Sequence, residues 1–130
     1  MGAKENADLV SKGYEAFQKG DLAAFDDILG DGCVWHVPGR GQLAGDKKGR
    51  QATVAYYGKL GELSEGTVKV ELHDVLANGE HVVGLHRTSA KRGGKSFETT
   101  AAIVFHVQNG RISEAWEHPF NLYEQDEVFG

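Results

Sequence analysis

The hydrophobic positions in the first half of the chain follow the spacing of helices. Over residues 4–19, apolar side chains recur every three or four residues, as they do on the buried face of an α-helix. Asp21 is a candidate N-cap of a second, short helix, and residues 50–63 predict a third. Between these helices, residues 33–37 predict a short strand. The first half is therefore expected to be mainly helical.

The second half predicts an antiparallel meander. Asn78-Gly79 and Asn109-Gly110 are typical two-residue hairpin turns, because both central residues of a type I′ turn need a positive φ, and Gly93-Gly94 is a third turn. These turns separate four expected strands, at about residues 67–77, 80–91, 95–107 and 111–118. Helices followed by a meander predict an α+β fold, with the helices packed on one face of a single sheet.

Composition and charge narrow the function classes. The 130 residues fit one domain, residues 1–130, and the net charge of −5 argues against nucleic acid or an anionic membrane surface as the main partner. No apolar segment is long enough to span a membrane and no signal peptide is recognisable, so we expect a cytoplasmic protein. Cys33 is the only cysteine and the six histidines lack metal-ligand spacing, so no metal site is expected.

The 18 glycines fall mainly at expected turns and helix ends. Several of them lie in residues 39–49, which we expect to form a flexible loop at the rim of a pocket. Gly39, Gly41 and Gly45 follow a strand and precede a helix, as in a nucleotide-binding loop. The spacing is one residue too long for such a loop, however, and no parallel βαβ unit accompanies it. A nucleotide is therefore not expected as a ligand.

The order of elements and several local motifs resemble the nuclear transport factor 2-like (NTF2-like) superfamily, in particular its SnoaL-like, ketosteroid-isomerase-related branch. The resemblance rests on the junction Gly20-Asp21-Leu22 and on the segments Trp35–Gly39 and Glu114–Phe120. It implies a cone-shaped fold, in which N-terminal helices pack in a strongly curved antiparallel sheet that encloses an apolar pocket. It also implies a homodimer formed through the outer face of the sheet.

The catalytic groups known from this branch are largely missing. Val37 stands where the resemblance places the aspartate base of ketosteroid isomerases, Gly13 stands at their oxyanion tyrosine, and residues 99–105 hold no acid. Steroid isomerisation by that mechanism is therefore not expected. Asn121 stands where SnoaL-type cyclases have a catalytic aspartate, and an amide cannot take up a proton at neutral pH. Asp126 follows one helical turn later; it could substitute for the missing aspartate, but we expect it to belong to a solvated C-terminal tail.

His36 and Glu117 are the candidate proton-transfer groups. His36 titrates near neutral pH, but strand alternation places either His36 or its neighbour Val37 toward the pocket. Glu117 in an apolar pocket would have a raised pKa and could act as an acid or a base; alternatively, it is a rim or interface carboxylate paired with an arginine. The candidate substrate-binding residues are Tyr14, Trp35, Tyr56, Leu60, His86, Phe105 and Asn121.

The sequence leaves three functions open. The first is a cofactor-independent acid–base enzyme, of isomerase, cyclase or hydrolase type, acting on a small and mostly apolar molecule. The second is a non-catalytic binding or accessory protein that keeps the pocket and lacks the acids, as Asn121 suggests. The third is an interaction module whose sheet face binds a partner. The fold alone does not choose among them, since one fold hosts many functions.

Overall fold

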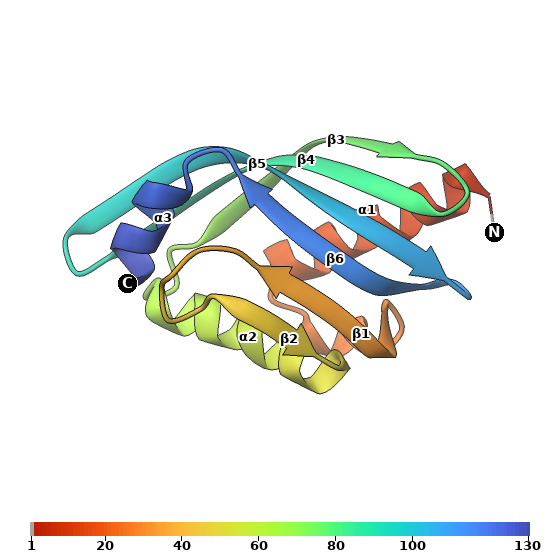
Figure 1. Cartoon of the computed structure of the whole chain (residues 1–130), viewed down its shortest axis with the longest axis horizontal. Coiled ribbons are helices and arrows are strands. Elements are labelled where there is room, and N and C mark those ends of the chain that lie inside the picture. The colour runs from red at the N-terminus through yellow and green to blue at the C-terminus, as the bar shows by residue number, and fades with distance from the viewer. Residues whose placement is uncertain (1) are drawn as a thin grey trace.

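Six strands form one sheet in the computed structural model, which describes residues 2–130 (Figure 1). The strands are β1 (Leu29–Val37), β2 (Gly45–Lys48), β3 (Lys69–Ala77), β4 (His81–Arg92), β5 (Lys95–Gln108) and β6 (Arg111–Pro119). Their order is β2-β1-β6-β5-β4-β3, and every neighbouring pair is antiparallel except β1 and β6. The α+β layout is confirmed, and the parallel β1–β6 pair corrects the expected all-antiparallel sheet.

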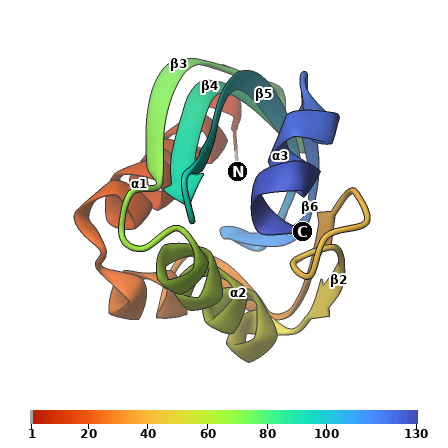
Figure 2. The same ribbon diagram turned by 90° about the vertical axis from the view of Figure 1, so that its left-hand side faces the viewer.

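The sheet curves into an open arc, and the helices lie on its concave side (Figure 2). The long helices α1 (Ala3–Lys19) and α2 (Arg50–Leu63) lie across the arc, and α3 (Leu122–Phe129) lies at one end. A short 3₁₀ helix, η1 (Leu22–Asp26), follows α1. Within residues 2–130, no helix is long and apolar enough to cross a membrane. The residues buried most deeply between helices and sheet include Val10, Leu29, Val82 and Ala115.

Helix α1 begins and ends within a residue of its predicted bounds. It ends at Gly20, whose φ of +69° is readily adopted only without a Cβ, and whose N–H reaches the carbonyl oxygens of Ala16 and Phe17. A second glycine brings α1 close to the sheet. A Cβ added at Gly84 on β4 would lie 2.6 Å from the Tyr14 hydroxyl oxygen, so only glycine leaves room for this phenol.

Two of the three predicted turns have the expected backbone. Asn109-Gly110 has φ values of +53° and +75°, and Gly93-Gly94 has values of +56° and +83°. The Asn78-Gly79 turn lacks the expected type I′ backbone, because neither residue has a positive φ. Instead, the Asn78 side-chain oxygen accepts hydrogen bonds from the N–H groups of Glu80 (2.9 Å) and His81 (2.8 Å). The type I′ prediction was therefore wrong at this turn, where a side chain replaces backbone geometry.

Two segments have more structure than the sequence predicted. Strand β2 lies within residues 39–49, which were expected to be a flexible loop, and it pairs with β1. Helix α3 replaces the expected solvated tail, and its Val128 and Phe129 are buried. The Asp126 carboxylate accepts hydrogen bonds from the backbone N–H groups of Arg40 (3.0 Å) and Gly41 (3.4 Å). These bonds tie α3 to the segment that leads into β2.

Candidate active site

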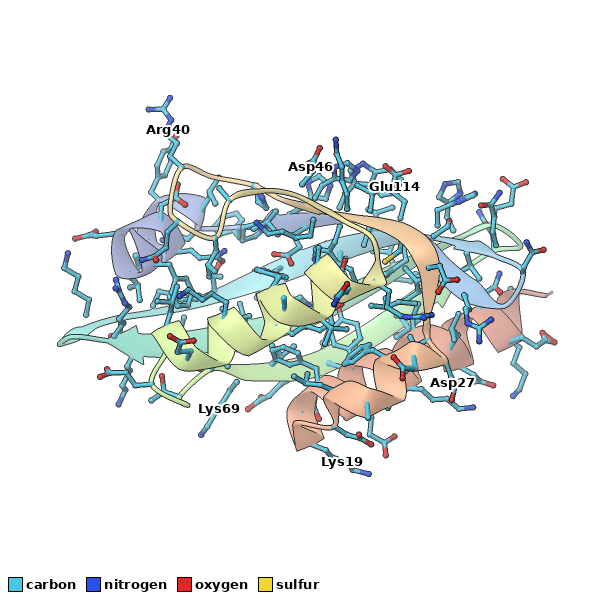
Figure 3. All side chains as sticks on the ribbon, turned by 90° about the horizontal axis from the view of Figure 1, so that it is seen from below. Lys19, Asp27, Arg40, Asp46, Lys69 and Glu114 are labelled. Carbon is cyan, nitrogen blue, oxygen red and sulfur yellow. The ribbon has the colours of Figure 1, made fainter. Side chains whose placement is uncertain are left out.

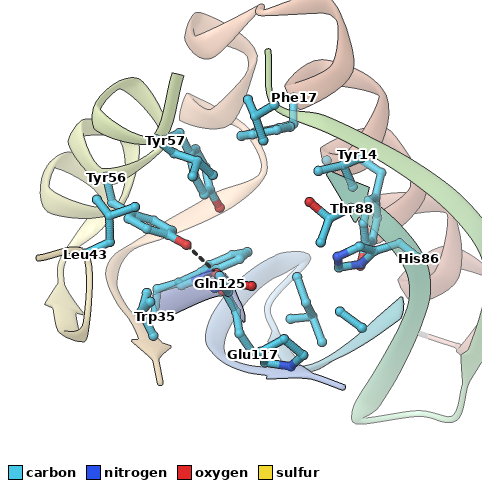
Figure 4. Close-up of a pocket in the computed structure, with 18 of the residues that line it drawn as sticks. Tyr14, Phe17, Trp35, Leu43, Tyr56, Tyr57, His86, Thr88, Glu117 and Gln125 are labelled. Carbon is cyan, nitrogen blue, oxygen red and sulfur yellow. Dashed lines mark hydrogen bonds between the residues drawn. The ribbon is translucent and has the colours of Figure 1, made fainter. Parts of the chain in front are cut away.

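A cavity lies between the concave face of the sheet and the three α-helices (Figure 4). Its volume is about 110 Å³, several times what one buried water needs. Most of its lining is apolar or aromatic, and the polar lining groups are few. The aromatic lining residues are Tyr14, Phe17, Phe25, Trp35, Tyr56, Tyr57, Phe97, Phe105 and Phe129.

Glu117 on β6 is the acidic group of this cavity. Its Oε2 atom accepts hydrogen bonds from the Trp35 indole Nε1–H (2.5 Å) and from the Tyr56 hydroxyl (2.9 Å; Figure 4). Its Oε1 atom has no hydrogen-bond partner among residues 2–130 and is not fully enclosed by protein atoms. One carboxylate oxygen is thus fixed by two donors, and the other is open to a ligand.

Burial raises the pKa of the Glu117 carboxyl above its ordinary value of 4.5. The hydrogen bonds from Trp35 and Tyr56, and the charge of Lys47, act in the opposite direction and offset part of this rise. The Lys47 Nζ atom lies 5.6 Å from the centre of the Tyr56 ring. The carboxyl is therefore a stronger base than an exposed glutamate and still has a cation close by.

Tyr14 on α1 and His86 on β4 lie across the cavity from Trp35 and Tyr56 (Figure 4). The Tyr14 hydroxyl and the His86 Nδ1 atom are 2.8 Å apart, which is a hydrogen bond. His86 is only 7% exposed, and burial lowers its pKa to about 4. Burial, and then the charge of Glu117, raise the pKa of Tyr14. Both members of this pair are therefore uncharged at neutral pH.

His36 does not join this site, which corrects its expected catalytic role. Val37 lines the cavity, so alternation along β1 directs His36 to the outer face of the sheet. There its Nδ1 lies 2.7 Å from the Asp46 carboxylate and its Nε2 lies 2.6 Å from that of Glu114. Figure 3 labels these two acidic residues, Asp46 and Glu114. Glu114, and then Asp46, raise the pKa of His36. This histidine therefore belongs to an ion cluster on the outer face of the sheet and lies outside the cavity.

Asn121 also lies outside the cavity lining, which corrects its expected binding role. It is the N-cap of α3: its side-chain oxygen accepts the Glu124 N–H at 3.2 Å, and its amide donates to the Glu124 carboxylate at 2.5 Å. The amide is therefore occupied in holding the helix terminus. The other expected binding residues all line the cavity, namely Tyr14, Trp35, Tyr56, Leu60, His86 and Phe105.

Some lining residues were missed in the sequence. Gln125 and Phe129 reach the cavity from α3, and Thr88 reaches it from β4. The sequence did contain a signal for helix α3, because Asn121 followed three residues later by Glu124 is a helix-start pattern.

Among residues 2–130, no group of three or more histidine, cysteine, aspartate and glutamate side chains is arranged to hold a metal ion. The cavity is thus lined mainly by apolar and aromatic side chains, with one carboxyl, one neutral tyrosine–histidine pair and the polar groups of Tyr56, Tyr57, Thr88 and Gln125.

Sequence comparison relates the chain to one family. Residues 10–115 match the family model of the SnoaL-like domain. An uncharacterised protein of Mycobacterium tuberculosis is 36% identical over 111 residues, which cover 85% of each protein. An uncharacterised protein of Mycobacterium bovis matches over the same length with the same identity.

Comparison with solved structures finds several proteins with the same fold. Bal32a, from a soil-derived mobile gene cassette, has a TM-score of 0.95 and 40% identity to the chain, with 98% of each chain covered. An NTF2-like protein from Burkholderia xenovorans has a TM-score of 0.84 and 21% identity, covering 100% of this chain and 99% of its own. An LEH-like epoxide hydrolase of Mycobacterium tuberculosis has a TM-score of 0.76 and 22% identity, covering 98% of this chain and 90% of its own. The last two likenesses show a shared fold.

Proposed function

The chain belongs to the SnoaL-like family of the NTF2-like superfamily, and we propose that it is a cofactor-independent acid–base enzyme acting on a small, mostly apolar molecule. One observation carries this proposal: the Glu117 carboxyl stands in an apolar cavity with Oε2 fixed by two donors and Oε1 open. An acid–base group needs a pKa nearer neutrality than that of an exposed glutamate, and burial moves Glu117 in that direction.

In the proposed step, the ionised Glu117 carboxylate takes a proton from the substrate through Oε1. A C–H bond of the substrate breaks, its electron pair moves toward a substrate carbonyl oxygen, and an O–H bond forms on Glu117. Trp35 and Tyr56 keep their hydrogen bonds to Oε2, so the carboxyl does not rotate as its charge changes. Return of the proton to another carbon of the substrate gives an isomerase. In a hydrolase, Glu117 instead takes a proton from water while the water oxygen bonds to an electrophilic substrate carbon; the bond from that carbon to its leaving oxygen breaks, and the leaving oxygen takes a proton from solvent. Neither step requires a cofactor.

Hydrogen exchange into carbon acids tests this step before the natural substrate is known. 3-Methyl-2-cyclohexenone is incubated with the protein in D₂O, and loss of its C–H signals is followed by proton NMR. We expect exchange faster than in buffer alone, and Glu117→Gln is expected to slow the protein-dependent rate about 10²- to 10⁴-fold. The rate is expected to fall as pH decreases through the raised pKa of Glu117, because only the carboxylate accepts a proton.

The matched control is Glu127→Gln, which removes an exposed carboxylate from α3 and is expected to leave the exchange rate unchanged. Protein-dependent exchange that survives unchanged in the Glu117→Gln variant would refute the proposed role of Glu117. A circular dichroism spectrum and a melting curve are recorded for each variant to check that its fold is retained.

A non-catalytic ligand-binding protein is the second candidate, and the charge of the cavity favours it. His86 and the tyrosines of the cavity are neutral at pH 7, so Glu117 has no charged acid partner there. A binding protein would take up the enone with a measurable heat of binding. It would show no exchange above the buffer rate at any pH between about 5 and 9.

A further inference from the structure

We propose that His86 recognises an acceptor oxygen of the substrate through its Nε2–H group, and that Tyr14 is a positioning residue that holds His86 in this tautomer. The substrate is then an uncharged, mostly apolar molecule with a carbonyl-type oxygen at the β4 side of the cavity. This inference rests on the proposed function, because it assigns the substrate class of the same site.

The tautomer follows from the hydrogen bond between Tyr14 and His86. The two atoms that meet, the Tyr14 hydroxyl oxygen and His86 Nδ1, are 2.8 Å apart. A phenol O–H is a stronger donor than a neutral imidazole N–H, and an unprotonated imidazole nitrogen is a stronger acceptor than a phenol oxygen. Tyr14 therefore donates to Nδ1. The single proton of the neutral imidazole then resides on Nε2.

The Nε2–H group is available to a ligand. Nε2 has no hydrogen-bond partner among residues 2–130, and it is not fully enclosed, although His86 as a whole is 7% exposed. His86 lines the same cavity as Glu117. Nothing else in the described protein satisfies this donor, so a ligand that offers no acceptor leaves it unpaired.

The register of the sheet separates the donor from the carboxyl. His86 on β4 pairs with Ala101 on β5, and Ala101 pairs with Pro119 on β6, two residues beyond Glu117. Two strand spacings lie between β4 and β6, which is about 10 Å along the sheet before its curvature is considered. The ligand therefore lies between the two groups. Its oxygen faces β4, and the atom that loses a proton faces β6.

The charge of the cavity selects an uncharged ligand. No lysine or arginine of the described residues lines it, and Glu117 repels an anion. His86 is neutral and contributes a dipole instead of a charge. Aromatic walls favour a flat apolar body. A ketone or enone meets these conditions, whereas a carboxylate or a phosphate does not.

The tautomer is tested directly in the wild-type protein, without any ligand. Nitrogen-15 labelling of the histidines and long-range proton–nitrogen NMR distinguish protonated from unprotonated ring nitrogens. We expect His86 to show a protonated Nε2 and an unprotonated Nδ1 at pH 7. Tyr14→Phe is expected to give a mixture of the two tautomers, whereas Tyr123→Phe, which changes an exposed tyrosine, leaves the signals unchanged. A wild-type His86 protonated on Nδ1 overturns the proposal.

Recognition of oxygen is tested with two probes of similar shape, acetophenone and isopropylbenzene. Binding is measured by calorimetry, and the carbonyl stretch of carbon-13-labelled acetophenone is measured by infrared difference spectroscopy. We expect acetophenone to bind at least about tenfold more tightly, because isopropylbenzene leaves the buried donor unpaired. The carbonyl stretch is expected to move to lower wavenumber on binding. Benzoate is expected to bind more weakly than acetophenone.

Variants assign this preference to His86. His86→Leu is expected to abolish the wavenumber shift and to reduce the preference for the ketone to less than about twofold. The control His73→Leu changes an exposed histidine of β3 and is expected to keep both the wavenumber shift and the preference for the ketone. An equal affinity of the wild type for the two probes, or an unchanged carbonyl shift in His86→Leu, contradicts the proposal. Glu117→Gln retains the ketone preference, so loss of exchange in that variant bears on the proposed function alone.

Discussion

Glu117 and His86 line the same cavity, and burial moves their proton affinities in opposite directions. It raises the pKa of the carboxyl and lowers that of the imidazole to about 4, because burial disfavours the charged form of each group. His86 is neutral at the pH where Glu117 ionises. The cavity thus contains at most one charge near neutral pH, which suits an uncharged ligand.

The lowered pKa of His86 makes the fold sensitive to acid. The folded value of about 4 lies below the ordinary value of 6.5, so the unfolded chain binds a proton that the folded protein does not. The free energy of unfolding is expected to decrease as pH falls from about 6.5 to about 4, by up to about 3 kcal/mol from this residue. Urea unfolding of the wild type and of His86→Leu at pH 7 and pH 4.5 measures the difference.

The Glu117 carboxyl opposes this trend, since its raised pKa makes the folded protein bind a proton more readily than the unfolded chain. Both proteins contain Glu117, so the comparison at each pH cancels its effect. A wild type and a His86→Leu variant that lose the same free energy between the two pH values would disprove the assigned pKa.

Alternation along a strand predicts two faces and does not say which one is inside. In β1, Trp35 and Val37 share one face, and His36 lies on the other. Packing against α2 determines that the Trp35 face lies inside, since the ring centres of Trp35 and Tyr57 are 5.3 Å apart. That contact joins residues far apart in the sequence, so the position of His36 could not be predicted from its own strand. The inward position of Glu117 depends on the same kind of contact.

At the scale of elements, long periodic segments were predictable, whereas β2 and α3 were not. Residues 4–19 and 50–63 carry enough apolar spacing to define α1 and α2 almost to the residue. Strand β2 has the sequence Gly-Asp-Lys-Lys, without apolar alternation, and exists because β1 offers it a partner. Helix α3 spans eight residues and depends on its cap and on contacts with the loop after β1. Tertiary pairing therefore defines the elements that the local pattern leaves undefined.

Gly39 is the residue on which the attachment of α3 depends. Its φ is +101°, and a Cβ there would overlap the Asp126 carboxylate. Gly39→Ala is expected to lower the free energy of unfolding by about 1–3 kcal/mol through backbone strain, and to release α3 through the overlap. Faster amide hydrogen exchange in residues 122–129 is the measurement that reports this release.

The matched control is Gly45→Ala. Gly45 has a similar φ of +110°, but a Cβ there meets nothing within 4 Å. This variant is expected to lose a similar free energy of unfolding while hydrogen exchange in α3 stays as in the wild type. Equal exchange in α3 for the two variants would show that Asp126 does not hold the helix.

At the scale of the whole molecule, a row of side chains crosses the outer face of the sheet. Val83, Val104, Trp116 and His36 are paired in register across β4, β5, β6 and β1. Val104 and Trp116 are half-buried although no helix within residues 2–130 covers this face. The family resemblance implies a homodimer through this face, and we propose that this row is its centre.

Light scattering at micromolar concentration tests the assembly. We expect a mass of twice the 14.1 kDa of one chain. Val104→Arg places a charge in the middle of the row and is expected to give a single chain, because an unpaired charge at an interface centre is costly to desolvate. Tyr123→Arg, at an exposed site on α3, is expected to remain dimeric. A wild-type mass of one chain contradicts the proposed homodimer.

The hydrogen bond between Trp35 and Glu117 also makes the site optically visible. The indole Nε1–H donates to Oε2 at 2.5 Å, so the excited state of this indole senses whether the carboxyl is charged. The other tryptophan, Trp116, lies on the outer face and can be replaced by phenylalanine to leave a single emitter. The ultraviolet emission of Trp35 would then report the ionisation of Glu117 and the arrival of a ligand, with no dye and no known substrate.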